Sequence, residues 1–267
     1  MDVDRPIISC VVVHRFYCAT LGVGLNNLAV EEAHHAAVTL RLQREDGVTL
    51  FDGCGHEGQG VVEQIDRRTV GVRVATIQTR PFDAVYRITL AVAMAKAHRQ
   101  GYLIEKCTEL GVAAIWPILA ERSVARPGEA AVDKWSRRAI EAAKQSGRSW
   151  VPVIAKPRTL EEAVSLSGEF AAAAFTEPDE KGIPFRSFLS TCPADGRILV
   201  FVGPEGGWTD SEREFTRRRG VQSVRLAPAI LRVETAAIAA CAAVSMISIG
   251  GCASCSPGVR GASEKSC

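Results

Sequence analysis

Apolar and polar residues alternate in short runs over the first 80 residues, a pattern typical of β-strands. β-Branched runs bounded by glycine and charged clusters predict strands at residues 8–13, 49–51, 60–64 and 70–77. Between them, residues 31–42 have helical spacing, with Ala33, Ala37 and Leu40, and less regularly Val38, on one apolar face. These elements predict a small β-barrel that includes a short helix.

From about residue 85 the apolar runs alternate with amphipathic segments. A strand at 86–94, a helix at 98–110 closed by Gly111, and a strand at 113–118 predict a βαβ unit with parallel strands. A charged helix and three short apolar strands are expected at 133–146, 171–175, 198–202 and 223–226. This alternation predicts an α/β domain.

The dipeptide Arg80-Pro81 is the expected boundary, because proline and its predecessor favour extended chain. We therefore expect a first domain at residues 1–80, a second at 81–250 and a flexible tail at 251–267. The length of 267 residues, with 47% apolar and 23% charged residues, excludes disordered, collagen-like and disulfide-miniprotein classes. Because the net charge is only +2, a nucleic-acid partner must be bound by a local basic patch.

Nine cysteines, an odd number scattered along a long chain, predict a reduced, cytoplasmic compartment. Cys252 and Cys255 form a lone CxxC without a second ligand pair, so no metal site is expected there. Residues 235–259 carry no charge, but they are rich in alanine and serine, and Gly250-Gly251 interrupts them. This segment is expected to be a buried core helix and not a membrane span.

The richest candidate site is the segment ILVFVGPEGGWTDSE at residues 198–212. A buried strand runs into the loop GPEGG, and Thr209 with Glu212 forms a capping box that opens a helix. The carboxyl end of such a strand is where α/β proteins bind ligands, and the glycines allow the backbone to approach a ligand closely. Glu205 has no evident packing role, and a phosphate loop is not supported because no Lys-Ser or Lys-Thr follows.

A second candidate is LAPAILRVETAA at residues 226–237, where a strand ends and a helix begins near Glu234. Arg232 and Glu234 stand in an otherwise apolar stretch, and buried charges need partners. From the residues alone, a structural ion pair and an active-site pair remain equally acceptable.

A third candidate is the basic stretch at residues 134–148, which has five bases and one acid. This excess favours a nucleic-acid partner, with Gln145 and Arg148 as additional phosphate or base contacts. His34-His35 is not expected to bind metal, because adjacent helix residues point about 100° apart. A hydrogen-bonded pair or an RNA contact is the preferred interpretation of these histidines.

Several segments together resemble one family, the 16S ribosomal RNA uracil-N3 methyltransferases of the SPOUT class. In chain order they are HHAAVTLRL (34–42), LFDG (50–53), EKCTELGV (105–112), AERSV (120–124), AAKQSGR (142–148), the GPEGG loop and ILRVETA. The resemblance covers roughly residues 31 to 249. It implies a PUA-like β-barrel followed by an α/β domain with a deep trefoil knot, a rare exception to the rule against threaded chains.

The resemblance also implies S-adenosylmethionine as cofactor, ribosomal RNA of the small subunit as partner, and a homodimer in which the final helix is interface. Three strand exits would converge on the cofactor, at residues 176–178, 203–207 and 226–231. The cofactor-binding residues it implies are Thr176, Glu177, Val202, Gly203, Pro204, Gly207, Leu226, Ala227, Ile230 and Leu231.

A uracil N3 proton must be removed before the ring nitrogen attacks a sulfonium methyl, and the charge developing on the base must be stabilised. Glu205 or Glu234 is the expected proton acceptor, and Arg232 is expected to stabilise the uracil oxygens. The expected RNA-binding residues are Arg15, His34, His35, Arg41, Lys96, Arg122, Lys134, Arg137, Arg138, Gln145 and Arg148.

The chain departs from the family's usual pattern at two positions, with Ala227 in place of a glycine and Ala229 in place of an arginine. The first adds a methyl group where close cofactor approach is expected, and the second removes a donor. Two rival interpretations therefore remain: a non-catalytic or weakened RNA-binding relative of this family, and an ordinary α/β nucleotide-binding enzyme.

Overall fold

The computed structural model describes residues 14–66, 68–82, 84–177, 182–194 and 196–250. The predicted strand at 8–13, the Cys252/Cys255 pair and the predicted tail lie outside these residues. The chain divides into two compact units. The first unit comprises Met1–Phe82, Ile104–Glu109 and Gly128–Ile154, and the second comprises Asp83–Leu103, Leu110–Pro127 and Ala155–Cys267.

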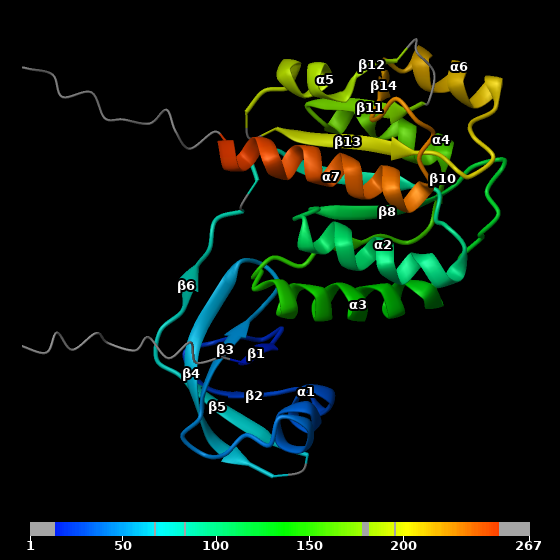
Figure 1. Ribbon diagram of the computed structural model, residues 1–267. Coiled ribbons are helices and arrows are strands. Elements are labelled where there is room, and N and C mark those ends of the chain that lie inside the picture. The colour runs from blue at the N-terminus through cyan, green and yellow to red at the C-terminus, as the bar shows by residue number, and fades with distance from the viewer. Residues whose placement is uncertain (1–13, 67, 83, 178–181, 195, 251–267) are drawn as a thin grey trace, which may run out of the picture. The chain divides into compact units, whose positions relative to one another are not determined.

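The first unit contains a mostly antiparallel sheet in the order β1-β3-β4-β5-β2, with β6 paired to β4 (Figure 1). Its strands are β1 (His14–Tyr17), β2 (Gly24–Asn27), β3 (Gly47–Phe51), β4 (His56–Ile65), β5 (Val70–Val74) and β6 (Gln78–Thr79). Strands β1 and β3 pair in parallel, and β4 has a bulge between Val62 and Gln64. The predicted strand at 70–77 is confirmed only as β5, which ends at Val74; β6 is a separate two-residue strand that lies after the predicted range.

The predicted single helix at 31–42 is wrong in its second half. Helix α1 (Val30–His34) passes into a π-helical turn, η1 (His35–Thr39), where the Leu40 N–H donates to the His35 carbonyl at 3.0 Å. The wider turn rotates the following side chains. Ala33 in α1 and Ala36 in the turn are buried, whereas Val38, expected on the apolar face, is 45% exposed.

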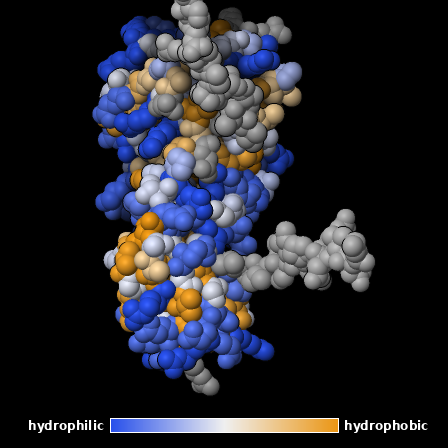
Figure 2. All heavy atoms as spheres, turned by 90° about the vertical axis from the view of Figure 1, so that its left-hand side faces the viewer, coloured by the Kyte–Doolittle hydropathy of each residue, from blue (hydrophilic) through white to orange (hydrophobic). Residues whose placement is uncertain are grey.

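The core of the first unit lies between this helix and the sheet. Phe16, Val48, Leu50, Val62 and Val72 pack there with Ala33 and Ala36. Figure 2 shows hydrophobic surface interspersed with hydrophilic surface in the lower half of the view, on this unit. Among the described residues, the large apolar residues of this unit that remain exposed are Val23, Leu25, Val30, Val38, Val61 and Val153.

Helix α3 (Ala130–Ser146) also belongs to the first unit and ends at Gly147, whose φ of +72° is the left-handed conformation of a helix C-terminus. Its buried face carries Lys144, whose ammonium lies 2.9 Å from both carboxylate oxygens of Glu32. The short strand β9 (Val153–Ile154) follows. The predicted charged helix at 133–146 is confirmed, and it begins three residues earlier.

The second unit contains a parallel sheet in the order β10-β8-β7-β13-β11-β14-β12 (Figure 1). Its strands are β7 (Arg87–Val92), β8 (Ala114–Leu119), β10 (Arg158–Thr159), β11 (Ala172–Thr176), β12 (Ile183–Pro184), β13 (Arg197–Val202) and β14 (Gln222–Arg225). The parallel pairing of β7 with β8 confirms the predicted βαβ unit. The α/β class predicted for this part of the chain is confirmed.

Helices cover both faces of this sheet, so its central strands are apolar at successive positions. In β13, Ile198 to Val202 are all buried. Helix α7 contacts β7 and β13 on one face, while α4 contacts β8 and β10. The helices of this unit are α4 (Leu160–Ser165), η2 (Ser167–Glu169), α5 (Phe185–Thr191), α6 (Asp210–Arg218) and α7 (Val233–Gly250). Helix α2 (Ala97–Glu109) is divided between the units, because its residues from Ile104 onward belong to the first.

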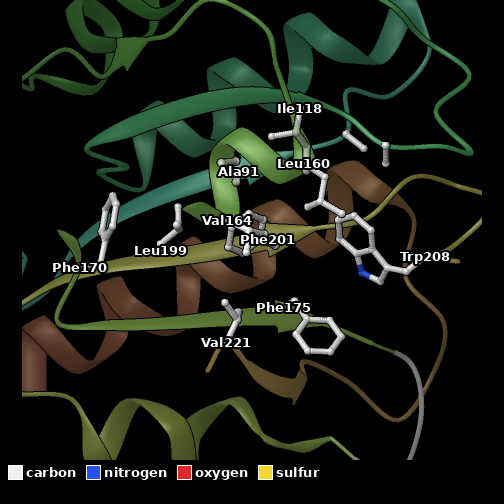
Figure 3. Packing of buried hydrophobic residues seen from close by; sticks show 13 residues of the cluster. Ala91, Ile118, Leu160, Val164, Phe170, Phe175, Leu199, Phe201, Trp208 and Val221 are labelled. Atoms are coloured by element: carbon white, nitrogen blue, oxygen red, sulfur yellow. The ribbon is translucent and has the colours of Figure 1, made fainter. Parts of the chain in front are cut away.

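The core on the α4 face extends along the sheet to the carboxyl end of β13. Figure 3 shows Leu160 and Val164 of α4 above Leu199 and Phe201 of β13, with Trp208 at the end of the cluster. Trp208 follows the GPEGG loop directly, so the core anchors the loop's C-terminal end. In the part of the chain that the structure describes, no helix is both long and apolar enough to cross a membrane.

Candidate functional site

The carboxyl ends of β13, β11 and β14 meet at one edge of the second unit's sheet, because these strands are parallel neighbours. The loops that follow them enclose a pocket of about 280 Å³ together with the first turn of α7. An edge of this kind is the usual ligand site of open α/β sheets. The three strand exits that the resemblance implied to converge therefore do lie around one pocket.

Every residue expected to bind the cofactor lines this pocket: Thr176, Glu177, Val202, Gly203, Pro204, Gly207, Leu226, Ala227, Ile230 and Leu231. Glu205, Ala229 and Trp208 line it as well. Both positions at which the chain departs from the family pattern, Ala227 and Ala229, thus face the pocket, where a side chain of different size or charge changes what the pocket can bind.

Two glycines of the loop are required for different structural reasons. A Cβ at Gly203 would lie 2.8 Å from the Trp208 ring, so only glycine lets this strand end pass the indole. Gly207 has a φ of +69°, and its N–H donates to the Pro204 carbonyl at 2.8 Å to close the turn. The indole Nε1 of Trp208 donates to the Thr176 carbonyl at 3.1 Å and so joins two of the loops.

The predicted capping box is confirmed and also fixes the loop. The Glu212 carboxylate accepts from the Thr209 N–H and from the Glu121 N–H, both at 2.8 Å. Arg122 donates from Nη1 to the Gly206 carbonyl at 3.1 Å. The segment after β8 therefore holds both the helix start and the GPEGG loop, which pre-organises the backbone that faces the pocket.

Glu177 is buried, with a side chain only 2% exposed, and its carboxylate is bound by arginines. Arg213 donates to Oε1, while Arg217 and the Ser223 hydroxyl lie 3.4 Å from Oε2. The hydrogen bond to Glu177 raises the pKa of Arg213. Glu177 thus holds α6 against the end of β11, and the charged atoms at this side of the pocket are already paired.

Of the three expected catalytic residues, only Glu205 lines the pocket. The Glu205 side chain is 32% exposed and lines the pocket, whereas Glu234 is 8% exposed and lies outside the lining. Arg232 is exposed and also stands outside the lining. Arg99 of α2, which sequence reasoning missed, lies 3.3 Å from Glu234 and 3.8 Å from Glu205.

Arg15, expected to contact RNA, is hydrogen-bonded within the first unit. Its Nη2 donates to Glu57 at 3.1 Å and to the Ser149 hydroxyl at 3.0 Å, and its side chain is 17% exposed. Arg80 donates to the other Glu57 oxygen at 2.7 Å. Arg15 is therefore held in this network by its partners, and its contact with RNA stays a prediction.

The basic stretch of α3 presents fewer free charges than its sequence suggests. Lys144 is buried against Glu32, and Arg138 is paired with Glu105. The other expected RNA-binding residues are exposed or partly exposed: His34, His35, Arg41, Lys96, Arg122, Lys134, Arg137, Gln145 and Arg148. These residues are divided between the two units, with Lys96 and Arg122 in the second.

The two histidines, His34 and His35, lie in different surroundings. His34 is exposed, whereas His35 packs edge-on against Phe16 with ring centroids 6.3 Å apart. Burial and the nearby Lys144 ammonium lower the pKa of His35, which favours the neutral ring. Among the described residues there is no group of three or more His, Cys, Asp or Glu side chains suited to a metal ion.

Comparison with family models matches most of the chain. Residues 83–245 match the RNA methyltransferase domain, and residues 28–74 match the RNA methyltransferase PUA domain. A similar protein is the ribosomal RNA small subunit methyltransferase E of Synechocystis sp., 31% identical over 82% of this chain and 72% of its own length. The protein of the same name from Bacillus subtilis is 29% identical over 80% of this chain and 87% of its own.

Solved structures give the same relationship. A methyltransferase from Legionella pneumophila, in complex with the cofactor SAM, superposes with a TM-score of 0.80 at 29% identity and covers 88% of this chain and 98% of its own. The ribosomal RNA small subunit methyltransferase E of Neisseria gonorrhoeae, bound to S-adenosyl methionine, has a TM-score of 0.79 at 29% identity, with the same coverage.

Proposed function

Because the chain belongs to the RNA methyltransferase family and carries the PUA domain of these enzymes, we propose that it methylates small-subunit ribosomal RNA with S-adenosylmethionine. The observation that carries this proposal is the pocket at the ends of β11, β13 and β14, which is lined by every residue expected to bind the cofactor. The similar proteins whose names specify this activity, and the similar structures that hold this cofactor, support it.

The pocket has the chemistry that S-adenosylmethionine requires. Val202, Leu226 and Leu231 supply apolar surface for an adenine ring, and the glycine loop exposes backbone donors and acceptors to the polar groups. Glu205 places a negative charge where a sulfonium would be attracted. When bound, the cofactor supplies an electrophilic methyl group.

The uracil N3 atom is the proposed target, and Glu205 is the proposed proton acceptor because its carboxylate both lines the pocket and reaches solvent. Removal of the N3 proton makes the ring nitrogen a nucleophile, which a positioned base promotes by about 10²–10⁴-fold. Arg232 is exposed at the start of α7. There it would stabilise the charge that develops on the uracil oxygens.

RNA is proposed to contact both units through the exposed cations named above. We assign residues 1–80 to a PUA-like RNA-binding barrel and residues 81–250 to the SPOUT methyltransferase domain. The chain of this second domain is proposed to form a deep trefoil knot. The proposed homodimer would use α7, where Met246 is 72% exposed and Ile247 36% exposed. The proposed compartment is the cytoplasm.

The test of this function is ribosomal RNA from a deletion strain, probed for N3-methyluridine by primer extension and mass spectrometry. Loss of one modified uridine, restored by the wild-type gene and not by a Glu205→Gln gene, is the expected result. Retention of every N3-methyluridine in the deletion strain would exclude this activity.

Purified protein separates the rival interpretations. Micromolar binding of S-adenosylmethionine in calorimetry is expected, and it excludes a relative that binds RNA only. RNA binding without heat release from the cofactor would favour the non-catalytic relative, in which Ala227 and Ala229 have weakened the pocket.

A further inference from the structure

Arg99 lies between two carboxylates that come from distant parts of the chain. Its Nη1 is 3.3 Å from Glu234 Oε1 and 3.8 Å from Glu205 Oε1. Arg99 is in the first turn of α2, after β7, and Glu205 follows β13. β7 and β13 are parallel neighbours, and residues 87–92 pair with residues 197–202. The segments that follow the two strands therefore lie at the same edge of the sheet.

The two carboxylates differ in what they can reach. Glu205 lines the pocket and its side chain is 32% exposed, whereas the Glu234 side chain is 10% exposed. The Oε2 atom of Glu234 is buried without a hydrogen-bond partner among the described residues. A buried carboxylate is costly unless a cation is paired with it, and Arg99 is the cation in reach.

On the basis of the proposed function, we propose that Arg99 is a positioning residue for methyl transfer, held by Glu234 and directing Glu205 into the pocket. Glu205, and not Glu234, then accepts the proton from the base. The ring nitrogen bonds to the methyl carbon, the methyl–sulfur bond breaks with its electron pair remaining on sulfur, and the N–H proton passes to Glu205. Atoms and charge balance without any further reactant.

The charges of the cluster explain why a second carboxylate is needed. Before the reaction, ionised Glu205, Arg99 and Glu234 carry a summed charge of −1. After proton transfer to Glu205, Arg99 and Glu234 remain as a neutral ion pair. Without Glu234, the same transfer would leave an unpaired cation in a partly buried site, which is less favourable.

Steady-state kinetics with RNA and S-adenosylmethionine test the proposal. Glu205→Gln should lower kcat by about 100-fold, the lower end for a lost proton acceptor. Arg99→Met should lower kcat by a similar factor, since displacing a reacting group by about 1 Å costs about 100-fold. Arg99→Lys keeps the charge, so its kcat should be about 10-fold higher than that of Arg99→Met. Its KM for RNA should stay within about 2-fold of the wild-type value.

Cofactor binding, measured by calorimetry, distinguishes positioning from misfolding. Arg99→Met, Arg99→Lys and Glu234→Gln should bind S-adenosylmethionine within about 3-fold of the wild type. The matched control is Arg186→Met, an exposed arginine of α5, which should leave kcat unchanged. If Arg99→Met does not fold, the lysine and Glu234→Gln variants carry the same test.

A double-mutant cycle decides between the two carboxylates. If Arg99 and Glu234 act through Glu205, adding Arg99→Met or Glu234→Gln to Glu205→Gln should cost no further activity. Fully additive losses would overturn the proposal, as would a kcat for Arg99→Met equal to the wild type. Wild-type protein that binds cofactor but methylates no RNA would instead contradict the proposed function.

Discussion

In the first unit the buried carboxylates Glu32 and Glu57 accept hydrogen bonds on both oxygens, whereas in the second unit Glu234 has one buried oxygen without a partner. Arginine or lysine is present in each case. In the first unit these cations pair with both oxygens of each carboxylate and hold a helix or loop in place, although Arg15 Nε is buried without a hydrogen-bond partner among the described residues. In the second unit the cation is shared with Glu205, whose carboxylate faces a pocket.

This difference shows how similar ion pairs serve different purposes. A buried carboxylate that is hydrogen-bonded on both oxygens fixes one packing arrangement, since losing its partner leaves an unpaired charge. An incompletely satisfied cluster beside a pocket leaves capacity for a substrate group or a moving proton. The predictions below test whether stability depends mainly on the first kind of cluster and ligand binding on the pocket of the second unit.

The largest effect is expected from Lys144→Met in the first unit. Removing the ammonium leaves Glu32 buried and unpaired, which should lower the free energy of unfolding by about 3 kcal/mol. Urea unfolding measures this loss. The exposed Lys134→Met in the same helix is the control and should change stability by less than about 0.5 kcal/mol. Adding Glu32→Gln should restore more than half of the loss, and no restoration would contradict a charge-based explanation.

Gly203→Val should act on the pocket of the second unit. A Cβ there would lie 2.8 Å from Trp208, so the ring or the strand end must move. We expect cofactor affinity to fall by about 100-fold, or about 2.7 kcal/mol, in calorimetry. Gly101→Ala is the control, because a Cβ at this position meets nothing within 4 Å. An unchanged cofactor affinity of the Gly203→Val variant would show that the loop is not part of the binding site.

Glu57→Gln should weaken the first unit in a pH-dependent way. Burial raises the pKa of Glu57, but hydrogen bonds from Ser149, Arg80 and Arg15 outweigh it, so the folded pKa lies below the ordinary 4.5. Its stabilisation is therefore present above pH 4.5 and is lost as the pH falls through the lowered folded value.

At pH 7 this variant should be less stable by about 2 kcal/mol in urea unfolding. The difference from the wild type should shrink as the pH falls below 4.5. A difference that stays constant across this range would show that the carboxylate charge is not what stabilises the network.

The smallest effects should come from the two capping boxes of the second unit. Thr159→Ala at α4 and Thr209→Ala at α6 each remove one N-cap hydrogen bond, at a cost of about 1 kcal/mol. Only Thr209→Ala, next to the GPEGG loop, should also reduce cofactor affinity, by about 3-fold. Equal cofactor affinities in both variants would mean that the cap and the loop are independent.

Much of the second unit could be predicted locally. The apolar run of β13, Gly111 after α2 and the Thr209-Glu212 capping box each depend on a few adjacent residues. The first unit was harder, because the π-helical turn at His35–Thr39 has no distinct sequence signal and moved Val38 to the surface. The pairing of Arg15 with Glu57 and Ser149 could not be predicted either, because these partners are distant in sequence.

The sequence by itself determined the longer strands and helices of the second unit, the glycine loop and the residues around the pocket, because these follow from local periodicity, turn chemistry and a resemblance in several segments. Only the tertiary structure decided which charges are free. It paired Lys144 with Glu32, and it brought Arg99 between Glu205 and Glu234. The physical reason is that the energy of a charge depends on burial and on partners far away in the chain, neither of which a local pattern contains.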